Sequence, residues 1–153
     1  MNIRYIREWN DGNTDNEHLA HWIEIQAFSN GINVAYNKQV SANFFPNQDV
    51  SGQSNIDICV NGDISLDNYI SVSLDLQRER PALIVIDLEQ VLPIDSIQIW
   101  HGYWNENRAY YTILEVSVDG KKWTRLYDYR HNKPNLESIF GTVYNLQDDL
   151  PKQ

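Results

Sequence analysis

The segment Leu114-Glu115-Val116-Ser117-Val118-Asp119-Gly120-Lys121-Lys122-Trp123 decides the fold class of this chain. Its first six residues alternate apolar and polar, with Leu114, Val116 and Val118 on one face, which is the pattern of a half-buried β-strand. Asp119-Gly120 is a strong hairpin-turn signal, and residues 123–129 follow as the returning strand. The segment therefore predicts an antiparallel β-hairpin.

Further strand patterns lie on the N-terminal side of this hairpin. Residues 82–88 are a nearly continuous apolar run, which predicts a strand buried on both faces, and residues 96–100 alternate with period two. Residues 3–9 and 21–28 predict two more strands, separated by a polar loop at residues 10–20. No stretch of twelve residues keeps a helical apolar period. The chain is therefore predicted to be an all-β sandwich or barrel, with a core that includes Trp22, Ile84, Ile86, Val116 and Trp123.

Length and composition are those of one soluble globular domain. The 153 residues, 42% hydrophobic and 22% charged, fit a single domain over residues 1–153 with one core. No apolar run approaches the ~20 residues that cross a bilayer, and the N-terminus lacks the apolar stretch of a signal peptide, so membrane insertion is not expected. The net charge of −9 argues against a nucleic-acid partner, because displacing phosphate counterions requires clustered cations. Cys59 is the only cysteine, which excludes an intrachain disulfide.

Five segments match motifs that occur together in one known family. Residues 117–123 fit S-x-D-G-x-x-W, residues 33–40 fit N-x-A-x-x-K-x-V, and residues 85–88 fit V-x-D-L. Asn61-Gly62-Asp63 is close to a D-G-D loop, and residues 100–110 are close to a W-H-Y-Y…R-x-Y hairpin. The chain thereby resembles the discoidin-type (coagulation factor C-type) galactose-binding-like domains, bacterial and phage tail members in particular. The resemblance implies a jelly-roll-like antiparallel β-sandwich that binds a ligand without catalysis.

The strand order differs from that of ordinary family members in one respect. Strands that resemble residues 4–7 and 21–26 close the domain at its C-terminus in those members, whereas here they come first. We therefore expect a circular permutant, or a domain cut in another register from a tandem array, with both strands inside the main sheets. Met1 and the segment after Tyr144 should then lie close together. Because such arrays occur in phage tail and bacterial surface proteins, the resemblance implies an extracellular or virion-associated setting within a larger multimeric assembly.

The resemblance also implies a structural Ca²⁺ at the loop that follows residue 60. The positions that match the family's ligands are Glu24, Asn61, Asp63 and Ser65. Oxygen donors on a turn suit a hard cation that takes six to eight ligands. Asn61 stands where the family has an acid, so one charge is missing and the affinity should be lower. The alternative is an Asn-Gly turn that is capped by Asp63 and needs no metal.

The stretch between residues 100 and 111 carries the residue types of a shallow saccharide site. Such a site needs an aromatic face for the sugar ring and planar polar groups for its hydroxyls. We expect Trp104, in a polar loop, to be exposed; if the site is elsewhere, the loop at residues 10–21 is the next candidate. The alternative makes Trp100 and Tyr110 core and pairs Arg108 with Glu106 or Glu115. The candidate ligands of a cell-surface glycan, galactose-like or another saccharide, are His101, Tyr103, Trp104, Asn105, Asn107 and Arg108.

Two functions remain open, and catalysis is not expected. The sequence contains no nucleophile elbow, no zinc-protease motif and no glycine-rich phosphate loop. One function is a carbohydrate-binding module; the other is a structural or protein-docking module of a virion or adhesin. A solvent-filled cleft lined by Trp104, His101 and Arg108 favours the first, and a broad apolar patch with those residues buried or salt-bridged favours the second.

Overall fold

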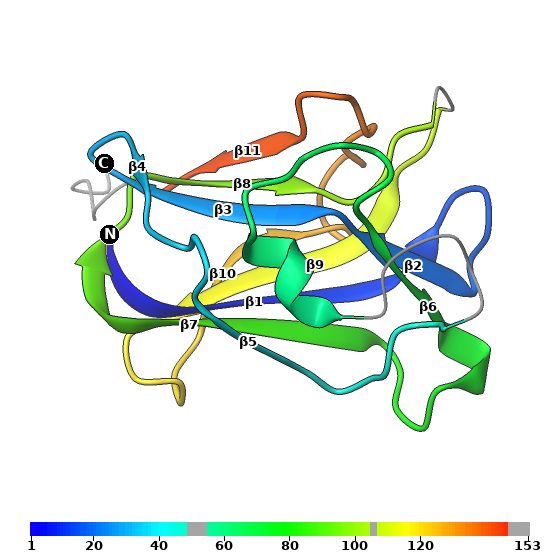
Figure 1. Ribbon diagram of the computed structural model, residues 1–153, viewed down its shortest axis with the longest axis horizontal. Helices are drawn as coiled ribbons and strands as arrows, with labels where there is room; N and C mark the ends of the chain where they lie inside the picture. Colours follow the sequence, from blue (N-terminus) through cyan, green and yellow to red (C-terminus); the bar gives the residue numbers. More distant parts are fainter. Residues whose placement is uncertain (49–54, 105–106, 147–153) are drawn as a thin grey trace.

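The computed structural model describes residues 1–48, 55–104 and 107–146, which form an all-β sandwich (Figure 1). Every pairing between its strands is antiparallel. Within the described ranges the only helices are two short 3₁₀ helices, η1 (Ile56–Val60) and η2 (Leu74–Leu76). The predicted fold class, an all-β jelly-roll-like antiparallel sandwich, is confirmed.

Two sheets form the layers, and a two-stranded ribbon lies at one end of them. The larger sheet has the order β10-β9-β1-β7-β5, with β1 (Asn2–Asn13), β5 (Gln39–Ala42), β7 (Ala82–Pro93), β9 (Tyr110–Ser117) and β10 (Thr124–Asp128). The second sheet has the order β11-β8-β3-β4, with β3 (Glu24–Ser29), β4 (Ile32–Asn33), β8 (Ser96–Trp100) and β11 (Thr142–Asn145). The ribbon pairs β2 (Leu19–Trp22) with β6 (Ile70–Ser73).

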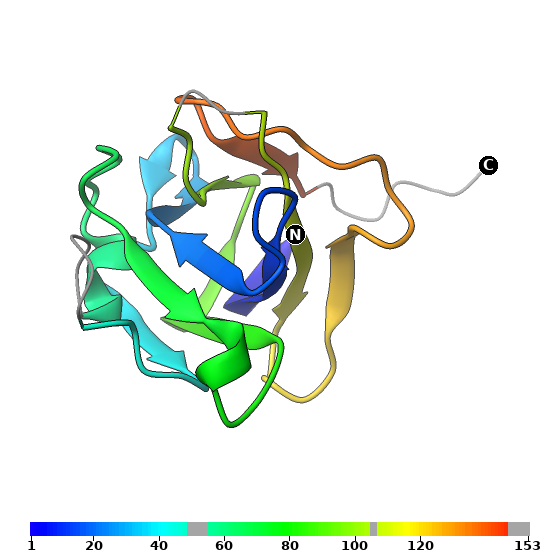
Figure 2. The ribbon, with the colours of Figure 1, turned by 90° about the vertical axis from the view of Figure 1, so that its right-hand side faces the viewer.

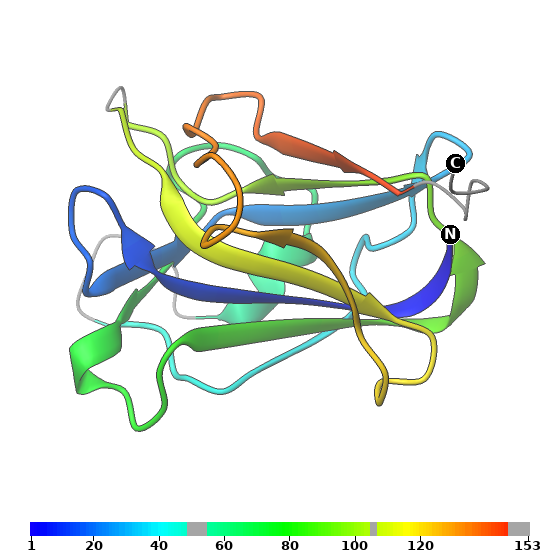
Figure 3. The same ribbon diagram turned by 180° about the vertical axis from the view of Figure 1, so that it is seen from behind.

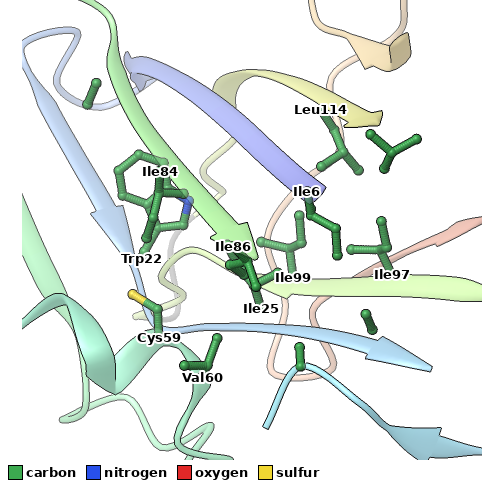
Figure 4. Packing of buried hydrophobic residues seen from close by; sticks show 14 of the residues in the cluster. Ile6, Trp22, Ile25, Cys59, Val60, Ile84, Ile86, Ile97, Ile99 and Leu114 are labelled. Atoms are coloured by element: carbon green, nitrogen blue, oxygen red, sulfur yellow. The ribbon is translucent and has the colours of Figure 1, made fainter. Parts of the chain in front are cut away.

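The core lies between the two sheets, where isoleucines of β1 and β7 meet those of β3 and β8 (Figure 4). Trp22, Cys59 and Val60 extend this cluster beneath the ribbon and η1. Four of the five predicted core residues are confirmed as fully buried: Trp22, Ile84, Ile86 and Val116.

The prediction that residues 82–88 are buried on both faces is wrong. Along this part of β7, Ile84 and Ile86 are buried, whereas Leu83 and Val85 are half-buried. A two-layer sandwich gives each strand one inner face, so alternate residues must lie on the outer face. An unbroken apolar run therefore does not by itself indicate a strand covered on both sides.

The polar loop expected at residues 10–20 is shorter than predicted, because β1 runs on to Asn13 and β2 begins at Leu19. Asn10 and Asn13 are buried, and their side-chain amides donate to the carbonyls of His21 and Leu19. Because these hydrogen bonds satisfy the buried amides, polar residues can occupy buried positions of β1.

Of the two N-terminal strands expected inside the main sheets, the first is confirmed and the second only in part. β1 occupies the centre of the larger sheet, between β9 and β7. Residues 21–28 do not form one strand, however, because the chain leaves β2 at Trp22 and enters a different sheet at Glu24. At this break Ile23 donates its N–H to the carbonyl of Trp100, 2.8 Å away.

The predicted hairpin forms between β9 and β10, but residues 118–123 make a longer connection than a two-residue turn. The Asp119 carboxylate accepts two backbone N–H groups within this loop. The loop carries Trp123 to the outer face of the larger sheet, where the Arg7 guanidinium carbon lies 3.8 Å from the centre of its ring. Trp123 is therefore half-buried, and its prediction as a core residue is wrong.

The two described ends of the chain lie close together, as predicted. Met1 accepts a hydrogen bond from Ile94 (2.8 Å), and Leu146 donates one to the adjacent Asp95 (2.9 Å). Figure 3 shows the N-terminus near the end of β11. The opposite end of the sandwich, which faces the viewer in Figure 2, carries the connection from β1 to β2 and the one from β8 to β9.

Candidate functional site

A pocket of about 320 Å³ opens at the end of the sandwich that Figure 2 faces. Three segments distant in sequence contribute to it: the ribbon strand β2, the residue before β6, and the connection between β8 and β9. We call it the Trp104 pocket, and the side chains that line it are Leu19, His21, Tyr69, Trp104 and Arg108.

The Trp104 ring is half-buried and held on several sides, instead of being exposed as predicted. Its centre lies 5.1 Å from that of His21 and 5.3 Å from that of Tyr69, both in edge-to-face arrangements. A Cβ atom added to Gly102 would lie 2.4 Å from the ring, so the ring rests directly on this glycine. The Arg108 guanidinium carbon is 5.2 Å from the ring centre. The aromatic surface is therefore fixed in place before any ligand arrives.

Arg108 forms an ion pair with Asp15, a residue that was not among its predicted partners. Its Nε donates to the Asp15 carboxylate at 3.0 Å, and the two side chains are 12% and 41% exposed. Glu115 instead accepts hydrogen bonds from Arg7 and Arg125, and Glu106 lies outside the described residues. The pocket thus has a donor-rich cation with an acceptor-rich anion beside it.

His21 contributes a neutral imidazole to the same pocket. Its Nδ1 is 2.7 Å from the Tyr110 hydroxyl. Burial, with the positive charge of Arg108 adding to it, lowers the pKa of His21 to about 3. Near neutral pH the ring is therefore uncharged and adds no further cation beside Arg108.

His101, predicted to bind sugar hydroxyls, is buried away from the Trp104 pocket and is only 2% exposed. Its Nε2 lies 2.7 Å from a Glu8 oxygen, and its Nδ1 lies 3.2 Å from a Glu137 oxygen. Burial opposes its charge, but the two carboxylates outweigh burial and raise the pKa of His101 to about 10. We call Glu8, His101 and Glu137 the carboxylate–histidine cluster. Because this cluster engages both ring nitrogens, His101 has none left for a ligand.

The other predicted sugar-binding residues are dispersed. Tyr103 lines a different pocket, and Asn107 is exposed but does not line the Trp104 pocket. Asn105 lies outside the described residues. The structure thus brings Trp104 and Arg108 together and separates them from His101 and Tyr103.

The motif at residues 100–111 does not reveal three residues that line the pocket, Leu19, His21 and Tyr69, nor Asp15, which pairs with Arg108. Leu19, His21 and Asp15 come from the loop at residues 10–21, the second region that the sequence had indicated. Nothing near Tyr69 in the sequence signals a site, because its role depends on the pairing of β6 with β2.

A second pocket, of about 380 Å³, is lined in part by residues 102 and 103, which directly precede Trp104 in the chain. Tyr103, Gly102 and two serines complete its lining, and no charged side chain is among the described lining residues. We call it the apolar pocket; its large apolar side chains are Ile23, Ile64, Leu66, Trp100, Ile139 and Phe140.

The predicted cation ligands fit a metal ion in part. Glu24 is fully buried; its Oε2 accepts the N–H of Gly62 at 2.9 Å, whereas its Oε1 has no hydrogen-bond partner among the described residues. Burial raises the pKa of Glu24 to about 7. A buried carboxylate oxygen without a partner is unusual, and a cation would satisfy it.

The loop itself is already closed by its own hydrogen bonds. Asp63 accepts from the N–H and the hydroxyl of Ser65, and Asn61 accepts from the N–H of Asp63. Over the described ranges, no group of three or more His, Cys, Asp or Glu side chains could hold a metal ion. An ion here would therefore have at most two acidic ligands, such as Glu24 and Asp63, with amide, hydroxyl and carbonyl oxygens completing its shell.

The comparisons with known proteins find no match to this chain among family models, curated proteins or solved structures. In the part of the chain that the structure describes, no helix is long and apolar enough to cross a membrane.

Proposed function

We propose that this chain is a non-catalytic carbohydrate-binding module, a discoidin-type galactose-binding-like domain with shifted strand order, that binds a glycan in the Trp104 pocket. The observation that carries the proposal is the convergence of Tyr69, Trp104 and Arg108 on one open pocket, with Asp15 paired to Arg108. These residues come from segments that are far apart in the chain, so the fold, and not one continuous motif, brings them together.

The chemistry of the pocket suits a sugar. Leu19, Tyr69 and Trp104 present apolar surface to the C–H face of a pyranose. Arg108 offers N–H donors and Asp15 offers carboxylate acceptors, so neighbouring hydroxyls, which both donate and accept, find complementary partners. Because the Trp104 ring is already fixed by its neighbours, binding costs little ordering entropy.

Affinity for one sugar should be weak. A monosaccharide buries little area, so we expect a Kd of roughly 1 mM, or ~4 kcal/mol. Useful adhesion would then require many copies, as in a multimeric virion or surface array. This is the setting that the family resemblance implies.

A glycan array with a pair of matched variants tests the proposal. Trp104→Leu should lose glycan retention, whereas Trp9→Leu, which changes another half-buried tryptophan on the outer face of the larger sheet, should keep it. Circular dichroism and melting would establish that both variants are folded. Equal retention by the two folded variants would place the sugar elsewhere and contradict the proposal.

We further propose that Ca²⁺ binds at Glu24 with oxygens of Asn61, Asp63 and Ser65. The unpartnered Glu24 oxygen supports this proposal. Bound there, the ion would supply a positive charge that compensates the buried carboxylate and holds the loop. Residues 64–66 of this loop line the apolar pocket, so the ion would also steady that pocket.

A structural or protein-docking module is the second candidate function. The observation that favours it is the exposure of Ile64, Ile139 and Phe140 around the apolar pocket, together with the ion pairs of Arg108 and His101. If the wild-type domain retains no glycan, while substitutions at these three apolar positions abolish assembly with its native partner, the second function holds.

A further inference from the structure

The apolar pocket has features of a ligand site that the proposed glycan function does not use. Ile23 and Trp100 are buried at its base. Around its opening, Ile64, Ile139 and Phe140 are 43%, 56% and 73% exposed. Large apolar side chains that gather around one concavity, instead of being scattered singly, indicate a binding site.

One side of the pocket is held by polar contacts to strand β8. The Trp100 indole donates to the carbonyl of Ile139 at 3.1 Å, and the Gln98 amide donates to the carbonyl of Phe140 at 2.8 Å. A Cβ atom on Gly141 would lie 2.8 Å from the Trp100 ring, so this segment rests on the indole. Because these hydrogen bonds fix the backbone of this segment, the side chains of Ile139 and Phe140 can stay exposed at the opening of the pocket.

The other two sides are fixed in the same way. The Glu137 carboxylate accepts the N–H groups of His101 and Gly102, at 3.0 and 3.3 Å. Across the pocket, the Asn68 amide donates to the carbonyl of Asp63 at 3.0 Å, which holds the start of the 64–66 segment. The concavity is therefore built into the backbone before a ligand binds.

We propose that the apolar pocket binds an uncharged, ring-sized apolar group. Its volume, about 380 Å³, lies in the range of small-molecule sites. No charged side chain is among its described lining residues, and the chain carries a net charge of −9. An anionic ligand would lose its hydration without gaining a partner and would be repelled by the protein as a whole.

The position of the pocket suggests which natural ligands carry such a group. Gly102 and Tyr103 line the apolar pocket, and the next residue, Trp104, lines the Trp104 pocket. A glycoside with an apolar aglycone would use both. This consequence rests on the proposed glycan function, whereas the binding of an apolar group does not.

Benzyl alcohol and benzoate are a matched pair of probes, a neutral ring and its charged counterpart. Titrated into the ¹⁵N-labelled full chain, benzyl alcohol should bind with a Kd of roughly 1 mM. It should shift the Trp100 indole N–H and the amides of residues 64–66 and 138–140. Benzoate should bind at least about tenfold more weakly, because it gains no ion pair.

Variants at the opening test the location. Phe140→Ser and Ile64→Ser should each weaken benzyl alcohol binding about fivefold or more, because each removes apolar contact area. Phe45→Ser is the control, since Phe45 is 86% exposed and lines a different pocket. All three side chains are exposed, so the variants should fold.

Three outcomes would overturn the proposal. The first is an equal affinity for benzoate and benzyl alcohol, and the second is a set of shifts that Phe140→Ser and Ile64→Ser leave unchanged. The third is a shift of the same amides with protein concentration alone. The last result, checked by sedimentation, would mean that another copy of the chain covers the pocket. Binding of benzyl alcohol without any glycan binding would support the pocket and contradict the proposed function.

Discussion

Two regions at one end of the sandwich use histidine in opposite ways, and Tyr110 lies between them. The Tyr110 ring stacks on His101 at 5.1 Å, while its hydroxyl is 2.7 Å from His21. In the carboxylate–histidine cluster the imidazole is charged and sealed from solvent. In the Trp104 pocket the imidazole is neutral and lines a cavity open to solvent.

The difference arises from what the neighbouring elements present to each ring. His101 meets Glu8 from β1 and Glu137 from the segment before β11, so its charge is paired. His21 lies in the same pocket as Arg108, so a second charge there would be repelled. A histidine's role is thus decided by partners distant in sequence. Only two residues lie between the structural His101 and Trp104, the candidate ligand-binding residue.

The largest expected effect comes from breaking the carboxylate–histidine cluster. His101→Gln would leave two buried carboxylates without their cation, which should lower the free energy of unfolding by about 3–5 kcal/mol. His18→Gln, at a 53% exposed side chain, should cost less than ~0.5 kcal/mol. Urea denaturation measures both. A loss below ~1 kcal/mol for His101→Gln would show that the cluster does not hold a paired charge.

The pH dependence of stability should separate the two histidines. Because the pKa of His101 rises from 6.5 to about 10 on folding, its contribution is complete below pH 6.5 and is lost as pH rises toward 10. Glu8, Glu137, Tyr110 and the more distant His21 face this ring. The slope of the free energy of unfolding should approach ~1.4 kcal/mol per pH unit in the middle of this range. His101→Gln should flatten this alkaline side; an unchanged slope would contradict the assignment.

His21 should act in the opposite direction. Its pKa falls from 6.5 to about 3 on folding, so its contribution is complete above pH 6.5 and is lost as pH falls toward 3. Arg108 and His101 are the charges that oppose its protonation. Unfolding curves for His21→Gln should therefore differ from wild type mainly on the acidic side.

The fold could be predicted from the sequence because its strand patterns are local. Period-two alternation at residues 96–100 and the Asp119-Gly120 turn each require only neighbouring residues. What lies across a sheet is not local, so the same reasoning misplaced Trp123. An aromatic residue in a strand signature can face the core or, as here beside Arg7, the outer face.

The candidate site was predicted in part for the same reason. The cluster of polar and aromatic residues between 100 and 111 contains Trp104 and Arg108, which the structure does bring together, but it could not show that the backbone turns His101 inward. The partners that decide this, Glu8 and Glu137, are 93 and 36 residues away along the chain. Asp15 likewise reaches Arg108 only because β1 and β9 pair.

Gly102→Ala should shift Trp104 without truncating any pocket side chain. The new methyl group would lie 2.4 Å from the Trp104 ring and 3.0 Å from the Tyr110 hydroxyl, so the ring must move. We expect about 1–3 kcal/mol of destabilisation, typical of overpacking, and a roughly tenfold loss of glycan affinity. Adding Gly102→Ala to Trp104→Leu should cost less than in the wild type, because the clash with the ring is gone. Additive costs would mean that Trp104 does not rest on this glycine.

Added calcium should give the smallest change in stability, and the variant Glu24→Gln tests whether the ion binds at the predicted loop. An ion that binds only the folded chain at ten times its Kd adds about 1.4 kcal/mol, or a few degrees in the melting temperature for a chain of this size. Glu24→Gln should remove this response, since the unpartnered oxygen would lose its charge. Near pH 7, without calcium, Glu24→Gln should melt no lower than wild type, because the burial that raises the pKa of Glu24 makes its charge costly.

The control is Asp57→Asn, which changes an exposed carboxylate on η1 and should keep the calcium response. If wild-type melts are identical with calcium and with chelator, the loop is the self-capped turn that Asp63 and Ser65 already form, and no ion belongs there.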